Sequence, residues 1–167
     1  YLQDKFTRLS VSGNETRVTV EHNIAVDFGG GFQVLLQAQV FVESGAVLEL
    51  INNTAGDGGG GMTLANGAMM RATGKRTQVV IVNNRADKYG AGIHIMSSST
   101  LLINTGALFV LRNNEATAGF GGGMWVQDEL SSLNVSGNGT HMTVEHNVAV
   151  ERGGGLLMFG AKMFVER

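Results

Sequence analysis

The sequence predicts an all-β fold, a right-handed parallel β-helix of about five coils with ~31 residues and three short strands in each. Three observations predict it. A motif with an asparagine, an alanine and a glycine triplet recurs at that period. Apolar and polar residues alternate within short segments, which is typical of β-strands. Proline is absent, and proline is excluded from strands that pair on both sides because it cannot donate to the ladder.

The repeating unit has an apolar residue three positions before the asparagine and ends in Gly-Gly-Gly followed by apolar-x-apolar. It reads VEHNIAVDFGGGFQV at its first occurrence and VEHNVAVERGGGLLM at its last. The marker asparagines are Asn23, Asn53, Asn84, Asn114 and Asn147. We expect them to form one line parallel to the helix axis, with amides of neighbouring coils hydrogen-bonded at ~4.8 Å. Glycine suits the tight corner of each coil because it reaches positive φ without steric cost.

Three strands are expected in the second coil, at Phe32–Leu36, Gln39–Glu43 and Ala46–Asn52. Stacking the repeats produces four wholly apolar columns, which should line the interior. Two of them, the first directly after the glycines and the second two positions further on, flank a mixed column. We expect this mixed column to face outward; its members are Gln33, Thr63, His94, Trp125 and Leu157.

A second marker is a glycine in an earlier turn, and its spacing to the marker asparagine alternates between ten and eight residues. The glycines are Gly13, Gly45, Gly74, Gly106 and Gly137. We therefore expect wide and narrow turns to alternate coil by coil. A longer repeat begins at Leu9 and returns at Leu133, which is 124 positions, or four coils, further on.

The chain starts and stops inside the repeating pattern, so we interpret residues 1–167 as a single β-helix segment, an internal fragment of a longer repetitive protein. The first and last coils carry the same motif as the middle ones. Because solenoid ends normally carry an atypical capping repeat, we expect both ends to stack on flanking β-helix coils or on another copy.

Composition excludes several classes of function. The net charge of −2 gives no basic footprint for nucleic acid, and no apolar run reaches the roughly 20 residues of a membrane span. Cysteine is absent, so disulfides and thiolate metal sites are excluded. Charged residues make up only 16% of the chain, while 43% is hydrophobic, which is enough for a continuous core.

The repeating units resemble those of a known family. VEHN, beginning at Val20, and GGGF, beginning at Gly29, are similar to the paired Phe-x-x-Asn and Gly-Gly-Ala-Ile motifs of the chlamydial polymorphic outer-membrane protein repeats. The resemblance runs from about Leu9 onward, with Val, Leu or Ile in place of the Phe. It implies a β-helical autotransporter passenger that acts as an adhesin.

Four Asn-x-Ser/Thr sequons are present, at Asn14, Asn52, Asn134 and Asn138. Asn14 and Asn138 fall in wide turns one long repeat apart, where a glycan would be exposed. Asn134 lies between apolar neighbours and should point outward. Asn52 is interpreted as structural, because it belongs to a corner column. The other members of that column are His22, Asn83, Asn113 and His146. In secreted eukaryotic material we expect N-linked glycans at Asn14 and Asn138; in a bacterial protein the sequons are chance matches.

Acidic residues follow the repeated alanine in four coils, as Asp27, Asp57, Asp87 and Glu151. Asp27 and Asp57 share a register at ~5 Å, and two like charges that close would raise one pKa or attract Ca²⁺. The column is interrupted at Ala118, and basic Lys88 and Arg152 are interleaved with it. We therefore favour a solvated turn and expect no metal and no cofactor.

No catalytic constellation is recognisable. Ser99, Ser131 and Ser132 lack His and Asp residues placed as partners, and His22 and His146 lie four coils apart, ~19 Å, too far to share a metal. Outward-facing Trp125 could stack on a sugar ring or pack against a neighbouring chain.

We therefore predict a structural or adhesive β-helical shaft of an extracellular or cell-surface protein or filament, without catalysis. Its partners would be flanking coils and a surface glycan or host receptor. Two alternatives stay open. A polysaccharide lyase or hydrolase would need a cleft with acids and bases spread over several coils. A carbohydrate-binding module would need more outward aromatic residues than Trp125.

Overall fold

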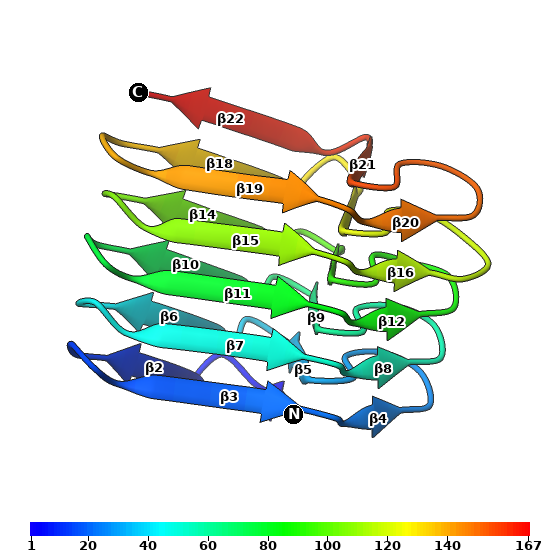
Figure 1. Cartoon of the computed structure of the whole chain (residues 1–167), viewed down its shortest axis with the longest axis horizontal. Coiled ribbons are helices and arrows are strands. Elements are labelled where there is room, and N and C mark those ends of the chain that lie inside the picture. The colour runs from blue at the N-terminus through cyan, green and yellow to red at the C-terminus, as the bar shows by residue number, and fades with distance from the viewer.

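The computed structural model describes all residues from Tyr1 to Arg167 and shows a parallel β-solenoid (Figure 1). Each strand pairs in parallel with its equivalents in the adjacent coils, and the strands at the two ends have one such neighbour, so four sheets run along the molecule. Figure 1 shows the coils stacked one above another from the blue N-terminal to the red C-terminal end. No helix of the structure is long and apolar enough to cross a membrane.

The four sheets are named here in the order in which the chain visits them. Sheet A contains β1 (Leu2–Gln3), β5 (Phe32–Leu35), β9 (Met62–Ala65), β13 (Ile93–Ile95), β17 (Met124–Gln127) and β21 (Leu156–Phe159). Sheet B contains β2 (Arg8–Ser12), β6 (Gln39–Glu43), β10 (Met69–Thr73), β14 (Thr100–Asn104), β18 (Ser132–Ser136) and β22 (Lys162–Glu166). Sheet C contains β3 (Arg17–Glu21), β7 (Val47–Ile51), β11 (Gln78–Val82), β15 (Leu108–Arg112) and β19 (His141–Glu145). Sheet D contains β4 (Ile24–Ala25), β8 (Thr54–Ala55), β12 (Arg85–Ala86), β16 (Glu115–Ala116) and β20 (Val148–Ala149).

The predicted solenoid is confirmed, and the strands of its second coil lie within one residue of the predicted bounds. The three longer strands of each coil are those of sheets A, B and C. The structure adds a fourth strand of only two residues, in sheet D, directly after the marker asparagine. A strand this short leaves no alternating pattern to recognise in the sequence, because alternation needs at least four residues.

The register of the sheets matches the predicted apolar columns. Leu48 pairs with Val79, which pairs with Phe109, and all three side chains are fully buried. One continuous core of 26 buried residues therefore runs through the coils. A slip of one residue in any strand would turn its apolar side chains to solvent, so burial fixes the register.

The corner between sheets C and D is a left-handed backbone position in every coil. The residue before each marker asparagine has a φ between 53° and 58°, as seen at His22, Asn52, Asn83, Asn113 and His146. Asparagine and histidine are among the few non-glycine residues that adopt this conformation readily. The corner column singled out in the sequence therefore marks the point where the chain turns.

Wide and narrow turns do alternate between sheets B and C, and a threonine hydroxyl joins them. The hydroxyl of Thr77, in a wide turn, accepts the backbone N–H of Gly45 in the narrow turn one coil earlier, at 3.0 Å. Thr140 does the same for Gly106, at 2.9 Å. Each hydroxyl also donates to a carbonyl of its own turn. A narrow-turn N–H that would otherwise be buried without a partner is thereby satisfied by the next coil.

The first glycine of each triplet is required by its backbone conformation. Gly59 has a φ of +63°, and a Cβ at this position would lie 2.4 Å from the carbonyl oxygen of Met62. Gly59→Ala is therefore expected to lower the free energy of unfolding by about 2–4 kcal/mol, from left-handed strain and from the clash with backbone. Denaturant unfolding monitored by circular dichroism measures this loss of stability.

The control for this prediction is Gly67→Ala. Gly67 also has a positive φ, but a Cβ there would meet only the side chain of Gln37, at 3.2 Å. The Gly67→Ala substitution should lower the free energy of unfolding only through left-handed backbone strain, by roughly 1–2 kcal/mol. Equal losses in the two variants would contradict the steric part of the argument.

Candidate functional site

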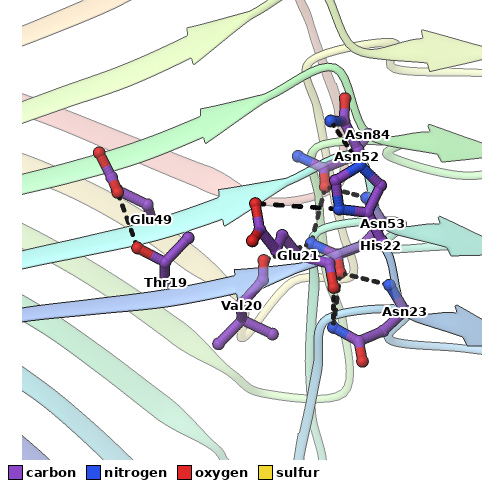
Figure 2. A network of polar contacts seen from close by, with 9 residues as sticks. All are labelled: Thr19, Val20, Glu21, His22, Asn23, Glu49, Asn52, Asn53 and Asn84. Atoms are coloured by element: carbon purple, nitrogen blue, oxygen red, sulfur yellow. Dashed lines mark hydrogen bonds and ion pairs between the residues drawn. The ribbon is translucent and has the colours of Figure 1, made fainter.

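The marker asparagines form a hydrogen-bonded ladder along the axis, as predicted, in which Asn53, Asn84 and Asn114 are buried; Figure 2 shows its first members. The amide nitrogen of each asparagine donates to the amide oxygen of the next, from Asn23 to Asn53 at 2.9 Å and from Asn53 to Asn84 at 3.1 Å. The bond from Asn84 to Asn114 measures 3.1 Å and that from Asn114 to Asn147 measures 2.9 Å. The ladder is unbroken through five coils.

Each interior amide of this ladder makes all four of its hydrogen bonds. The Asn53 oxygen accepts both the backbone N–H and the side-chain amide of Asn23. The Asn53 nitrogen donates to the Val20 carbonyl at 2.9 Å and to the oxygen of Asn84. Full satisfaction explains how a polar side chain with an exposed fraction of zero persists here. The ladder stabilises the fold and presents no group to a ligand.

The sequon asparagines occupy three kinds of position. Asn14 and Asn138 are exposed in wide turns, where the sequence placed them. Asn134 is half-buried in β18, and its amide oxygen is buried without a hydrogen-bond partner. Asn52 is exposed at its left-handed corner, where its amide contacts a ring nitrogen of His22 at 3.2 Å (Figure 2). The expectation of glycans at the two wide turns therefore concerns two sequons whose asparagines are exposed.

The acidic column after the repeated alanine is partly neutralised by a lysine. The Asp57 carboxylate forms a 2.5 Å ion pair with the ammonium group of Lys88, one coil further on. Hydrogen bonding to Asp57 and the charge of that carboxylate raise the pKa of Lys88. The backbones of Asp27 and Asp57 are joined directly, at 2.7 Å. No group of three or more acidic, histidine or cysteine side chains is arranged to hold a metal ion.

The loops that connect sheet D to sheet A stack in register at one side of the solenoid (Figure 1). Their contacts with Thr63 and His94 place them over the outer face of sheet A. We call them the D–A loops: residues 26–31, 56–61, 87–92, 117–123 and 150–155. Their stacked positions are Phe28, Gly58, Tyr89, Phe120 and Arg152. The prediction that the mixed column faces solvent is therefore wrong for Thr63 and His94, which are 0% and 1% exposed. The hydroxyl of Thr63 donates to the Gly58 carbonyl of the D–A loop in its own coil.

The D–A loops and sheet A enclose an aromatic block, which consists of Phe28, Tyr89, His94, Phe120 and Trp125. The ring of His94 is stacked on Trp125, with centroids 5.2 Å apart, and lies 5.6 Å from the ring of Tyr89. Phe120 and Tyr89 each contact Trp125 as well. The space for the imidazole exists because Gly58 carries no side chain; a Cβ there would lie 2.9 Å from a ring nitrogen of His94. Trp125 is half-buried rather than fully outward.

His94 is held neutral by this environment. Burial lowers its pKa to about 4, and Gln127 nearby opposes this only partly. Both ring nitrogens are buried without a hydrogen-bond partner. The sequence signal for this burial is the aromatic residue directly before the first glycine in three coils, at Phe28, Tyr89 and Phe120. These positions lie in the spacer of the repeating unit.

The serines with buried hydroxyls have structural partners. Ser99 accepts the backbone N–H of Ala68, and Ser131 accepts that of Ser99. The Ser131 hydroxyl donates to Asp128 at 3.1 Å. Partial burial acts to raise the pKa of the Asp128 carboxylate, but hydrogen bonds from Ser97 and its neighbours outweigh it, and the pKa lies below its usual value. These hydrogen bonds hold the turns between sheets A and B in place.

Comparison with known proteins agrees with this geometry. A family model described as right handed beta helix region matches residues 3–149, which is most of the chain. Comparisons with curated proteins and with solved structures give no match. Parallel ladders in four sheets, a period of about 31 residues and one continuous core are what such a helix requires. The chain belongs to the right-handed β-helix family.

Proposed function

We propose that the chain is part of the shaft of an extracellular or cell-surface protein, with a structural or adhesive role. The observation that carries the proposal is continuity: the asparagine ladder and the apolar core pass through every coil without a break. A solenoid of this kind gains length by repetition, because each coil contacts only its neighbours. The surface is sparsely charged, with 16% charged residues.

A finer proposal is that the shaft is an adhesin of the type found in chlamydial polymorphic outer-membrane proteins. Its support is the resemblance of the VEHN and GGGF units to the paired motifs of those repeats. The proposal assigns no reaction to the chain. Purified protein should therefore release no reducing ends and no unsaturated products from a panel of acidic and neutral polysaccharides, and turnover of any of them would favour the enzyme alternative.

Surface labelling tests the location. Antibodies raised against the purified chain should label intact cells of the source organism, and brief treatment of those cells with external protease should remove the signal. A cytoplasmic protein of the same cells serves as the control and should resist both. Adhesion is tested separately, by the binding of protein-coated beads to host cells. Labelling seen only after the cells are permeabilised would overturn the surface location.

We expect the isolated chain to associate end to end. At its C-terminal end, Met163, Phe164 and Val165 of β22 are 42%, 45% and 68% exposed, and β22 has a paired neighbour on one side only. A strand with an open edge is a template for further pairing. Light scattering should therefore show oligomers whose mass rises with concentration.

The variant Met163→Lys/Val165→Lys should shift this distribution towards monomer, because charged residues on an edge strand oppose pairing. Lys75→Glu, in an exposed turn away from both ends, is the matched control. A monodisperse monomer of the unmodified chain at all concentrations would contradict the expectation.

A further inference from the structure

Two asparagines of the chain are followed directly by a glycine, Asn66 by Gly67 and Asn138 by Gly139. In such a pair the side-chain amide can react with the next backbone nitrogen, because glycine has no side chain that obstructs the approach. Both asparagines are exposed. The two pairs are therefore equivalent in sequence, and only the fold distinguishes them.

The backbone nitrogen of Gly67 is held by a hydrogen bond in the folded chain. It donates to the carbonyl of Ser97, in the next coil, at 2.8 Å. The bond belongs to the stacked turns between sheets A and B, where Gln37 likewise donates to the carbonyl of Asn66. To attack the side chain of Asn66, the Gly67 nitrogen would have to leave its acceptor, which requires a local opening of the turn.

The backbone nitrogen of Gly139 has no such acceptor. Asn138 and Gly139 lie at the tip of a wide turn between sheets B and C, and both are exposed. The turn itself is held in place, because Thr140 donates its backbone N–H to the carbonyl of Gly137 at 3.2 Å and its hydroxyl bonds to the neighbouring coil. No hydrogen bond of the structure involves the N–H of Gly139. The nitrogen that would react is therefore free in a turn that is otherwise ordered.

This openness is a property of the wide turn and not of its place along the solenoid. Residues 74–77 form the equivalent turn in the middle of the molecule, with a coil bonded to it on either side. Lys75 takes the place of Asn138 in that turn and remains exposed. Arg76 takes the place of Gly139; it is exposed as well, and its N–H has no acceptor either. A further coil stacked on the turn of Asn138 would therefore leave this asparagine open to solvent.

We propose that Asn138 is a site of spontaneous deamidation, and that the fold protects Asn66 from the same reaction. The nitrogen of Gly139 forms a bond to the Cγ atom of Asn138 and the bond from Cγ to Nδ2 breaks. Ammonia leaves with the proton of the Gly139 N–H, and a five-membered succinimide ring remains. Water then adds to one of the two ring carbonyl carbons and the C–N bond at that carbon breaks, which yields aspartate or isoaspartate.

The reaction changes both the charge and the backbone of the wide turn. Either product adds a negative charge to a chain whose net charge is −2. Isoaspartate also inserts one carbon atom into the main chain, close to the Thr140 hydroxyl that accepts the N–H of Gly106 in the preceding coil. A glycan on Asn138 would occupy Nδ2 and block the loss of ammonia. Glycosylation and deamidation of this side chain therefore exclude each other.

The first test compares the two asparagines within one molecule. The chain is produced in a bacterial host that adds no N-linked glycans and is kept at neutral pH and physiological temperature. Peptide mapping by mass spectrometry follows aspartate and isoaspartate at each site. In the folded chain Asn138 should react at least about tenfold faster than Asn66, the factor that corresponds to roughly one hydrogen bond. In urea, which unfolds the chain, the two should react at similar rates. Equal rates in the folded chain, or an undiminished difference in urea, would overturn the proposal.

A pair of reciprocal substitutions separates the effect of the glycine from that of the turn. The first wide turn reads GNET where the turn of Asn138 reads GNGT, and Glu15 has a φ of 67° against 75° for Gly139. A Cβ at Gly139 would meet only the Cα atom of Gly106, at 3.8 Å, so Gly139→Glu should fold. It should slow the reaction at Asn138 to the rate at Asn14, and Glu15→Gly should raise the rate at Asn14 to that of Asn138. If Gly139→Glu does not fold, the reverse substitution decides alone. A folded variant that leaves the rate at its asparagine unchanged would overturn the proposal.

Discussion

Replacement of Asn84 with leucine should lower the free energy of unfolding by about 3–6 kcal/mol. Asn84 is 1% exposed, and its amide makes four hydrogen bonds. Leucine would leave the backbone N–H of Asn53, an amide hydrogen of Asn53 and the Leu50 carbonyl without these partners. Each such buried group costs roughly 1–3 kcal/mol.

The measurement is denaturant unfolding followed by circular dichroism, with Asn138→Leu as the control. Asn138 is exposed, so its replacement should stay within about 0.5 kcal/mol of the unmodified chain. A loss below about 1 kcal/mol for Asn84→Leu would mean that the neighbouring amides find other partners, and the ladder would then be dispensable. Failure of Asn84→Leu to fold would agree with the expectation, provided that Asn138→Leu folds.

The second large effect is the response of stability to acid. The pKa of His94 is about 4 in the folded chain against an ordinary value of 6.5, because burial in the aromatic block disfavours the imidazolium. Between these two values the unfolded chain binds a proton that the folded chain does not. Stability is therefore full above pH 6.5 and falls as the pH drops towards 4. The total loss attributable to His94 is roughly 3 kcal/mol.

His94→Phe should remove this component, since a phenyl ring suits the aromatic block and does not titrate. The experiment compares the free energy of unfolding at pH 7 and pH 4.5 for both proteins, with His141→Asn at an exposed position as the control. Other groups, Asp128 among them, also respond to acid, so the informative quantity is the difference between variants. Equal losses on acidification in the unmodified chain and in His94→Phe would show that His94 plays no part.

Much of the fold was predictable because it repeats. Five copies of one unit aligned the apolar columns, and the column that contains Val79 and Phe109 predicted the register in which their strands pair. The asparagine ladder followed from the same alignment, since a polar residue conserved in position in every coil has its best partners directly above and below it.

The features that could not be predicted from the sequence lie where the coils differ from one another. The burial of His94 depends on Gly58, Tyr89 and Phe120, which occupy one stacked position of the D–A loops. In this column the aromatic residues are interrupted by a glycine and followed by an arginine, so it is not uniformly apolar and did not mark the outer face of sheet A as covered at Thr63 and His94. The candidate site was therefore the least predictable part of the molecule, although Trp125 had been singled out.

The threonine bridge between turns has a consequence for how such a protein changes in length. Thr77 satisfies the narrow turn of the preceding coil and not that of the following one, and Thr140 repeats this two coils later. A narrow turn and the wide turn after it are therefore one indivisible unit. Removal of a single coil would place two turns of the same kind side by side. A backbone N–H would then be left without a hydrogen-bond partner. We therefore expect such proteins to gain or lose coils in even numbers. The duplication that begins at Leu9 and returns at Leu133 spans four coils, which is an even number.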